Sequence, residues 1–317
     1  MNLFWSVYKN LEKEVLKLAD NIHFSDKQLN VYSMKIADLI VRCAIEIEAI
    51  SKALYSMNGG VAKFNDKGKE INLYFDTDCI DYLENKWHLS KKKIIIAAAN
   101  FYFEKEDSRI LTPLKKANKQ GNSGSKWKQA YQSLKHDRQN SLEKGNVQNL
   151  IAALGALYIL NIYYKDDSIK LVKHEDINTR QGSDVFEVIC FDATRVTQSN
   201  IADSEIRDLD KLSEAILIKK YQTKSIQTLE KEFKDFNDKL NNEIIKSPQY
   251  ADEINKDPEK YINSTNAYNN RMELFKSIQS TEYFHGLVSK IGVAKIVSTS
   301  QNAKVDICCN KHEVIYK

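Results

Sequence analysis

Residues 127–164 read WKQAYQSLKHDRQNSLEKGNVQNLIAALGALYILNIYY, and this stretch decides the fold. Its second half, Val147 to Tyr164, is the most apolar segment of the chain, with apolar side chains at steps of three and four residues. That spacing predicts a buried helix. Two asparagines and a glycine inside the segment, and many charges just outside it, favour the central helix of a bundle over a membrane span.

The composition also favours helices. The 317 residues include only 3 prolines and 10 glycines, and 28% of them are charged, which is unlike a turn-rich β protein. The five cysteines are odd in number and include no CxxC pair, so we expect reduced thiols, no metal and no cofactor. The first twenty residues lack the pattern of a signal peptide. We therefore predict a cytoplasmic protein that does not enter membranes.

The character of the chain changes after Tyr164. We predict a mainly α protein, in which an N-terminal helical bundle (residues 1–165) is followed by a smaller α+β region (residues 166–317) with short antiparallel strands. Within the bundle, apolar periodicity predicts helices over 3–20, from about 27 to Met57, over 78–87 and over 91–103. The C-terminal elements expected are strands within about 169–196, a long helix over about 204–246, a linker over 247–266, a helix over about 267–291 and a terminal β pair over 293–316.

Positive charge is concentrated just before the central helix. Between Arg109 and Lys144 there are nine Lys or Arg residues against two Asp or Glu, and the GNSGS run at 121–125 predicts a mobile basic loop. Such a surplus is typical of a surface that contacts nucleic acid. The lysines that we expect to make these contacts are Lys115, Lys116, Lys119, Lys126, Lys128 and Lys135.

Two aromatic residues lie within the same stretch. Trp127 and Tyr131 are four residues apart and would share one face of a helix beside the basic loop. Aromatic rings at such a place can stack on nucleic-acid bases. The alternative is that both rings belong to the core of the bundle.

The candidate reactive group is His136, in the run Lys135, His136, Asp137, Arg138. A histidine among charged neighbours can act as a general acid or base near neutral pH, and Arg138 with Lys135 could stabilise a phosphate during RNA cleavage. The alternative is a structural network in which His136 and Arg138 hydrogen-bond to Glu46 or Glu48 of the second helix. The catalytic hypothesis assigns those two carboxylates an orienting role.

Four features together resemble HEPN-like helical-bundle proteins, in particular the abortive-infection branch with a KHxR-type signature. They are IEIEAISKALY at 45–55, the W-x-x-x-Y element of Trp127 and Tyr131, LKHDRQN at 134–140, and the Ala- and Leu-rich helix at 147–164. The resemblance covers about residues 1–165. It implies an all-α bundle, frequent dimerisation and a role in stress or phage defence.

In catalytic members, the same resemblance implies metal-independent ribonuclease activity from an Arg followed four to six residues later by a His. This chain departs from that pattern, because His136 precedes Arg138 and position 142 is a leucine.

The sequence therefore leaves several functions open. One is an endoribonuclease, and another is a non-catalytic module that binds RNA or a protein partner. A third, without a motif behind it, is a small-molecule site between the two halves of the chain.

Overall fold

The computed structural model describes residues 3–165, 169–171, 178–194, 210–246, 248–278 and 280–312. It confirms a mainly helical protein with a smaller α+β part. By contacts the chain divides into two compact units: Met1–Ile169, Asp176–Lys220 and Asp306–Lys317 form the first unit, and Lys170–Glu175 with Tyr221–Val305 form the second unit. This division does not coincide with the predicted boundary at residue 165.

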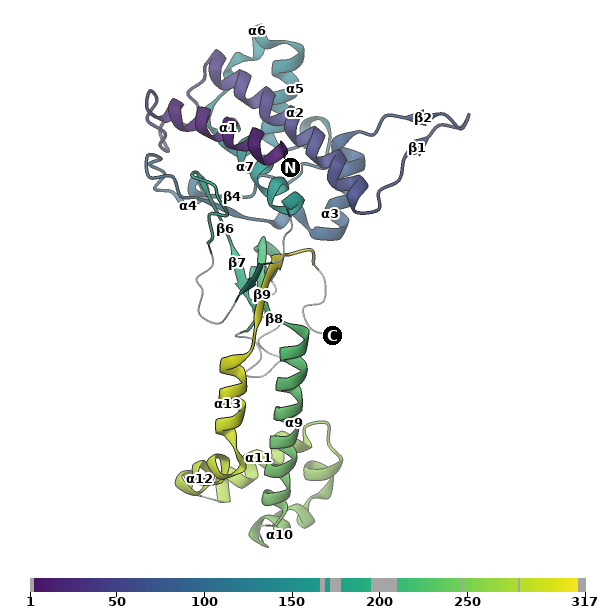
Figure 1. Cartoon of the computed structure of the whole chain (residues 1–317), viewed down its shortest axis with the longest axis vertical. Helices are drawn as coiled ribbons and strands as arrows, with labels where there is room; N and C mark the ends of the chain where they lie inside the picture. Colours follow the sequence, from purple (N-terminus) through teal and green to yellow (C-terminus); the bar gives the residue numbers. More distant parts are fainter. Residues whose placement is uncertain are drawn as a thin grey trace. The chain divides into compact units, whose positions relative to one another are not determined.

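Helices dominate the first unit (Figure 1). They are α1 (Leu3–Ala19), α2 (Met34–Met57), α3 (Asp81–Trp87), α4 (Glu106–Arg109), α5 (Lys126–His136), α6 (Arg138–Ser141) and α7 (Val147–Lys165). Short π and 3-10 turns occupy Phe75–Ile80, Leu89–Lys91, Gly121–Ser123 and Leu142–Lys144. Helix α2 begins later than expected, because Ser33 caps it by accepting a hydrogen bond from the N–H of Ile36.

Helix α7 is the centre of the first unit, as the sequence predicted. It packs against α1, α2 and α5, and most of its side chains are buried. Among the described helices it alone is long and apolar enough to cross a membrane, with 83% of the tested window buried inside the protein. Gly155 lets α7 approach β3 closely, since a Cβ atom there would lie 2.7 Å from Cδ1 of Ile94.

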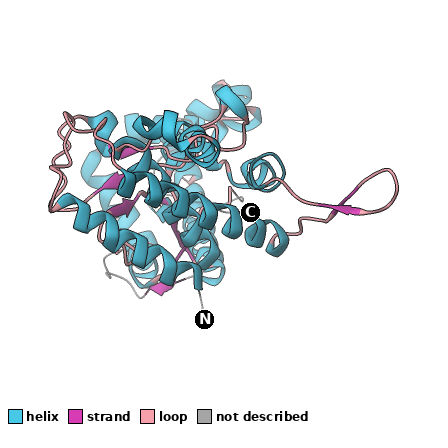
Figure 2. Cartoon of the chain, turned by 90° about the horizontal axis from the view of Figure 1, so that it is seen from above, coloured by secondary structure: helices cyan, strands magenta, loops and turns pink. Residues whose placement is uncertain are grey.

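The strands form three small sheets. Figure 2 shows strands as short magenta segments among the helices. Antiparallel β1 and β2 make a ribbon that projects away from the helices of the first unit (Figures 1 and 2). Strand β3 pairs antiparallel with both β4 and β6, and the third sheet has the order β5-β9-β8-β7. The bounds are β1 (Lys63–Phe64), β2 (Glu70–Ile71), β3 (Ile94–Ile96), β4 (Ile110–Leu111), β5 (Ile169–Leu171), β6 (Phe186–Val188), β7 (Cys190–Asp192), β8 (Leu217–Tyr221) and β9 (Val305–Cys309).

Two predicted helices contain strands instead. The helix expected over 91–103 is replaced by a turn and β3, because three consecutive isoleucines pair with strands on both sides. The long helix expected over 204–246 is interrupted by β8, which lies parallel to β7. Residues 204–209 of that prediction lie outside the described residues. A run of apolar residues does not by itself distinguish a buried strand from a buried helix.

The second unit is helical. Its helices are α9 (Thr223–Ile245), α10 (Pro248–Lys256), α11 (Ala267–Ile278), α12 (Thr281–Ile291) and α13 (Val293–Asn302), with a π turn at Glu259–Asn263. Side chains from α9, α10, α11 and α12 form its core around Tyr250 and Phe275. The expected linker at 247–266 is thus largely helical, and the helix expected over 267–291 is two helices, the second capped by Ser280.

The prediction of a strand in the first half of the terminal β pair is wrong. Val293–Asn302 is helix α13, and Gly292 directly before it has a left-handed conformation with φ of 114°. The alternation of Val293, Lys295 and Val297 suggested a strand, but Ile296 is the residue that is buried, and Lys295 pairs with Glu232 of α9 at 2.7 Å. The second strand is confirmed as β9, while residues 313–317 lie outside the described part of the chain.

Candidate functional site

The predicted reactive pair lies at a break between two helices. Helix α5 ends at His136, and Asp137 then caps α6 by accepting a hydrogen bond from the N–H of Asn140 at 3.3 Å. The His136 side chain is exposed and forms no hydrogen bond with a described residue. Arg138 is half-buried, and its Nη1 donates to Oδ1 of Asp38 on α2 at 2.6 Å. The structure therefore gives Arg138 a partner that the sequence analysis missed.

Glu46 and Glu48 do not orient this pair. They follow Asp38 by eight and ten residues on α2, so they lie about 12 and 15 Å further along the helix axis. Glu48 pairs instead with Lys52 at 2.9 Å, in an exposed i,i+4 contact. Neither the catalytic role nor the structural role predicted for the two glutamates is supported by a contact.

Three residues that we expected to contact nucleic acid are buried in the first unit. Trp127 is 1% exposed, and its Nε1 donates to the carbonyl oxygen of Pro113 at 2.8 Å. Tyr131 is 3% exposed. Lys128 is 3% exposed and pairs with Asp76 at 2.9 Å. Burial leaves almost no surface of these three side chains for contact with nucleic acid, so the prediction is wrong for all three.

The Lys128–Asp76 pair holds the loop before α5. Besides binding Asp76, the Lys128 ammonium donates to the carbonyl oxygens of Ala117 and Lys119. Burial alone would raise the pKa of the Asp76 carboxyl, but hydrogen bonds from Lys128, the Thr77 N–H and Gln120 hold this pKa below its usual value. The carboxylate is thus ionised at neutral pH and fully engaged.

Other lysines of the basic stretch surround a cavity of about 430 Å³ beside the start of α5. Lys115, Lys116 and Lys126 line it, and all three are exposed. Among the described residues none of them forms an ion pair, and no acidic side chain lines the cavity. The remaining wall is apolar or uncharged and comes from Leu111, Thr112, Pro113, Asn122, Gly124, Ser125, Trp127, Gln129, Gln148, Asn149 and Ala152.

Two predicted contact lysines stand apart from this cavity. Lys119 lies 3.9 Å from Asp81, and Lys135 lies over the ring of Tyr131 at 5.6 Å from its centroid. Neither lines the cavity. The sequence thus identified the basic stretch correctly but could not separate the lysines that converge from those that do not.

The backbone around the cavity is tightly folded. Gly124 cannot carry a side chain, because a Cβ atom would lie 2.8 Å from the carbonyl oxygen of Lys119. The Gln129 side chain donates to the Gly124 carbonyl oxygen at 2.7 Å, which ties the loop to α5. Lys116 has φ of 60°, a left-handed conformation that costs a residue with a Cβ atom about 1–2 kcal/mol. Such strain is commonly found at functional positions.

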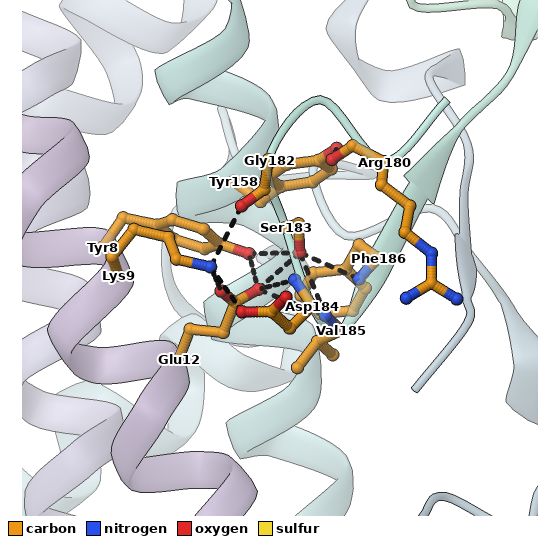
Figure 3. A network of polar contacts seen from close by, with 10 residues as sticks. All are labelled: Tyr8, Lys9, Glu12, Tyr158, Arg180, Gly182, Ser183, Asp184, Val185 and Phe186. Carbon is orange, nitrogen blue, oxygen red and sulfur yellow. Dashed lines mark hydrogen bonds and ion pairs between the residues drawn. The ribbon is translucent and has the colours of Figure 1, made fainter. Parts of the chain in front are cut away.

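A second polar network, which the sequence analysis did not identify, joins α1 to the residues before β6 (Figure 3). Glu12 is fully buried, and its carboxylate accepts hydrogen bonds from Tyr8, from Ser183 and from the N–H groups of Asp184 and Val185. Lys9 pairs with the same carboxylate. Both oxygens of the Glu12 carboxylate are engaged, as expected of a buried structural cluster.

Metal chemistry has no visible site, because the described residues contain no group of three or more His, Cys, Asp or Glu side chains placed to hold a metal ion. Comparisons of the chain with protein-family models, with curated proteins and with solved structures gave no match. The resemblance to HEPN-like proteins therefore stays a prediction from the sequence.

Proposed function

We propose that the protein is a non-catalytic RNA-binding module that holds the phosphate backbone at the lysine-lined cavity beside α5. One observation carries the proposal: three exposed lysines, without carboxylate partners among the described residues, converge on one cavity. Unpaired ammonium groups bind nucleic-acid phosphates by releasing condensed counterions. The choice of RNA over DNA rests on the HEPN-like resemblance of residues 1–165, as do the expected homodimer and the role in phage defence.

The ribonuclease hypothesis has less support from the geometry. Arg138 is engaged by Asp38, and the two glutamates expected to assist it lie more than two turns of α2 away. What favours this hypothesis is the exposed imidazole of His136, which has no hydrogen-bond partner among the described residues and is open to a substrate. A cleavage readout in the binding experiment separates the two functions.

The test compares binding of a labelled 20-nucleotide single-stranded RNA by the wild type and by the triple variant Lys115→Gln, Lys116→Gln, Lys126→Gln, in EDTA. The slope of log K against log salt concentration is negative, and each lost phosphate contact reduces its magnitude by about 0.7. The slope of the triple variant should therefore be smaller in magnitude by about 2, and its affinity at 0.1 M salt should be lower by roughly tenfold or more. Fluorescence anisotropy across a salt series measures both quantities.

The matched control removes three exposed lysines of the first unit that lie outside the cavity, as Lys13→Gln, Lys27→Gln, Lys105→Gln. It has the same net charge as the test variant and should bind nearly as the wild type does. Equal losses in the two variants would mean nonspecific attraction and would overturn the proposed site. RNA shortened by the wild type but not by His136→Ala would favour the ribonuclease instead.

Strain at Lys116 gives a prediction in which stability and binding change in opposite directions. Lys116→Gly should raise the free energy of unfolding by about 1 kcal/mol, because glycine adopts φ of 60° without strain, and should weaken RNA binding several-fold because the ammonium is lost. Urea unfolding and anisotropy are the two measurements.

The neighbouring Lys115→Gly, at a residue without positive φ, should lower stability while weakening binding similarly. A loss of stability in Lys116→Gly would contradict the argument from strain.

A further inference from the structure

We infer that the cavity beside α5 binds a phosphate monoester at an end of the RNA chain, in preference to a phosphodiester within it. This inference rests on the proposed RNA binding and adds the group that is recognised. Its basis is a set of unpaired hydrogen-bond donors at the start of α5, whose lack of acceptors the three lysines do not explain.

The first observation is the unsatisfied start of α5. The first N–H of this helix that has a partner belongs to Gln129, which donates to the Ser125 carbonyl oxygen at 3.0 Å. The N–H groups of residues 126–128 have no acceptor among the described residues. This helix of eleven residues has two lysines and no acidic residue in its first turn. Negative charge stabilises a helix N-terminus, so the charge present here has the opposite sign. An anion would satisfy the N–H groups and the helix dipole together.

The second observation is independent of the helix and concerns Ser125. This residue lines the cavity and is 8% exposed, yet its hydroxyl has no hydrogen-bond partner in the part of the chain that the structure describes. It occupies the N-cap position without capping, because its side chain accepts no bond from the helix. A buried hydroxyl without a partner is unfavourable, and native proteins rarely retain one without a reason. An oxygen of a bound phosphate would accept a hydrogen bond from it.

The number and charge of these donors fit a monoester. Ser125, Lys126 and Trp127 at the helix start line the cavity together with Lys115 and Lys116, so unpaired main-chain N–H groups, one hydroxyl and three ammonium groups, all of them donors, belong to residues around one space. A phosphate monoester offers three terminal oxygens and a charge of about −1.5 to −2 at pH 7, whereas a bridging phosphodiester offers two oxygens and a single charge. The apolar part of the wall, which includes Leu111, Pro113 and Ala152, can cover the terminal nucleoside.

The experiment measures binding of the full chain to one RNA 10-mer with three different ends: a 5′-phosphate, a 3′-phosphate, or hydroxyls at both ends. The label is placed internally, so that it leaves both ends free. We expect one phosphorylated end, or both, to bind about tenfold more tightly than the hydroxyl form, and we expect inorganic phosphate at millimolar concentration to remove that preference.

Two variants assign the preference to the cavity. Ser125→Ala removes the unpartnered hydroxyl, so the protein should stay at least as stable while the preference falls several-fold. Gln148→Glu adds a carboxylate to the cavity wall with almost no change in shape, and should abolish the preference by repulsion. The matched control is Gln132→Glu, the same change at an exposed residue of α5 outside the cavity, which should keep the preference.

The outcomes are distinct. Equal affinity for all three RNA ends, with the lysine-dependent binding intact, would overturn the terminal-phosphate inference and leave RNA binding standing. A preference that survives Gln148→Glu would place the phosphate elsewhere and would also overturn it. The absence of binding to any RNA would overturn the proposed function and this inference together.

Discussion

Glu12→Ala is expected to lower the free energy of unfolding of the first unit by about 3–5 kcal/mol, because the substitution leaves several buried donors without their acceptor. The Tyr8 and Ser183 hydroxyls and the N–H groups of Asp184 and Val185 all donate to this one carboxylate (Figure 3). Water cannot replace it readily, since Glu12 and Tyr8 are fully buried. Burial and the nearby Glu12 also raise the pKa of the Tyr8 phenol, so Tyr8 stays a donor at any physiological pH.

The effect should be measured locally as well as globally, because two compact units need not unfold in one transition. Urea unfolding followed by circular dichroism gives the global change. Hydrogen exchange of the segment 180–190 reports the opening of the residues that Glu12 holds, and protection there should fall most.

The control for this variant is Asp184→Asn. It breaks the pair between Lys9 and Asp184, 2.7 Å apart, but the Asp184 side chain is 67% exposed. Exposed ion pairs contribute little, so its cost should stay below about 1 kcal/mol. Similar losses in Glu12→Ala and Asp184→Asn would show that the buried carboxylate does not organise this part of the fold.

The apolar elements of the first unit could be predicted from the sequence. Helices α1, α2 and α7 are each long enough for a three- and four-residue spacing to be unambiguous. Short apolar runs were not predictable, as β3 and α13 illustrate. The residues of β3 are apolar in either conformation, and only pairing with β4 and β6 selects the strand.

The candidate site could be predicted only in part. Composition located the basic stretch, but which lysines stay unpaired depends on contacts between residues distant in the sequence. In the sequence, nothing distinguishes Lys128 from the neighbouring lysines. In the fold, it pairs with Asp76, which lies 52 positions earlier in the chain. Glu12 looked like an ordinary surface glutamate of an amphipathic helix, but three of its hydrogen-bond donors belong to residues more than 170 positions later. No local pattern signals such pairings, because they arise only from tertiary packing.

Lys128→Met is expected to lower the free energy of unfolding by about 3–5 kcal/mol at pH 7, because it leaves the Asp76 carboxylate buried without its counter-charge. Asp76→Asn should lower the free energy of unfolding by a similar amount, because it leaves the Lys128 ammonium buried without its counter-charge. The double variant should lose clearly less than the sum of the two single variants, since neither charge then stays buried alone. Urea unfolding at pH 7 of the four proteins completes the cycle, and additive losses would contradict the pairing.

The same pair predicts a dependence on pH. The pKa of Asp76 is lower in the folded protein than in the unfolded chain, where it is about 3.9. Its contribution to stability is therefore complete above about pH 5 and is lost as the pH falls through the folded value. Between pH 5 and pH 3 the wild type should lose more stability than the double variant, which has no carboxyl group at position 76. Equal losses in the two proteins would contradict this assignment.

The pair also connects stability with binding. Lys128 reaches the carbonyl oxygens of Ala117 and Lys119, and the Lys119 carbonyl in turn lies against Gly124 at the start of α5. Lys128→Met should therefore displace the wall that carries Lys115, Lys116 and Lys126, and weaken RNA binding although Lys128 itself cannot touch RNA. At temperatures where the variant is still folded, the loss should appear as lower affinity with a nearly unchanged salt slope, because no exposed charge has been removed. A drop in slope matching that of an exposed lysine would instead mean that Lys128 contacts phosphate directly.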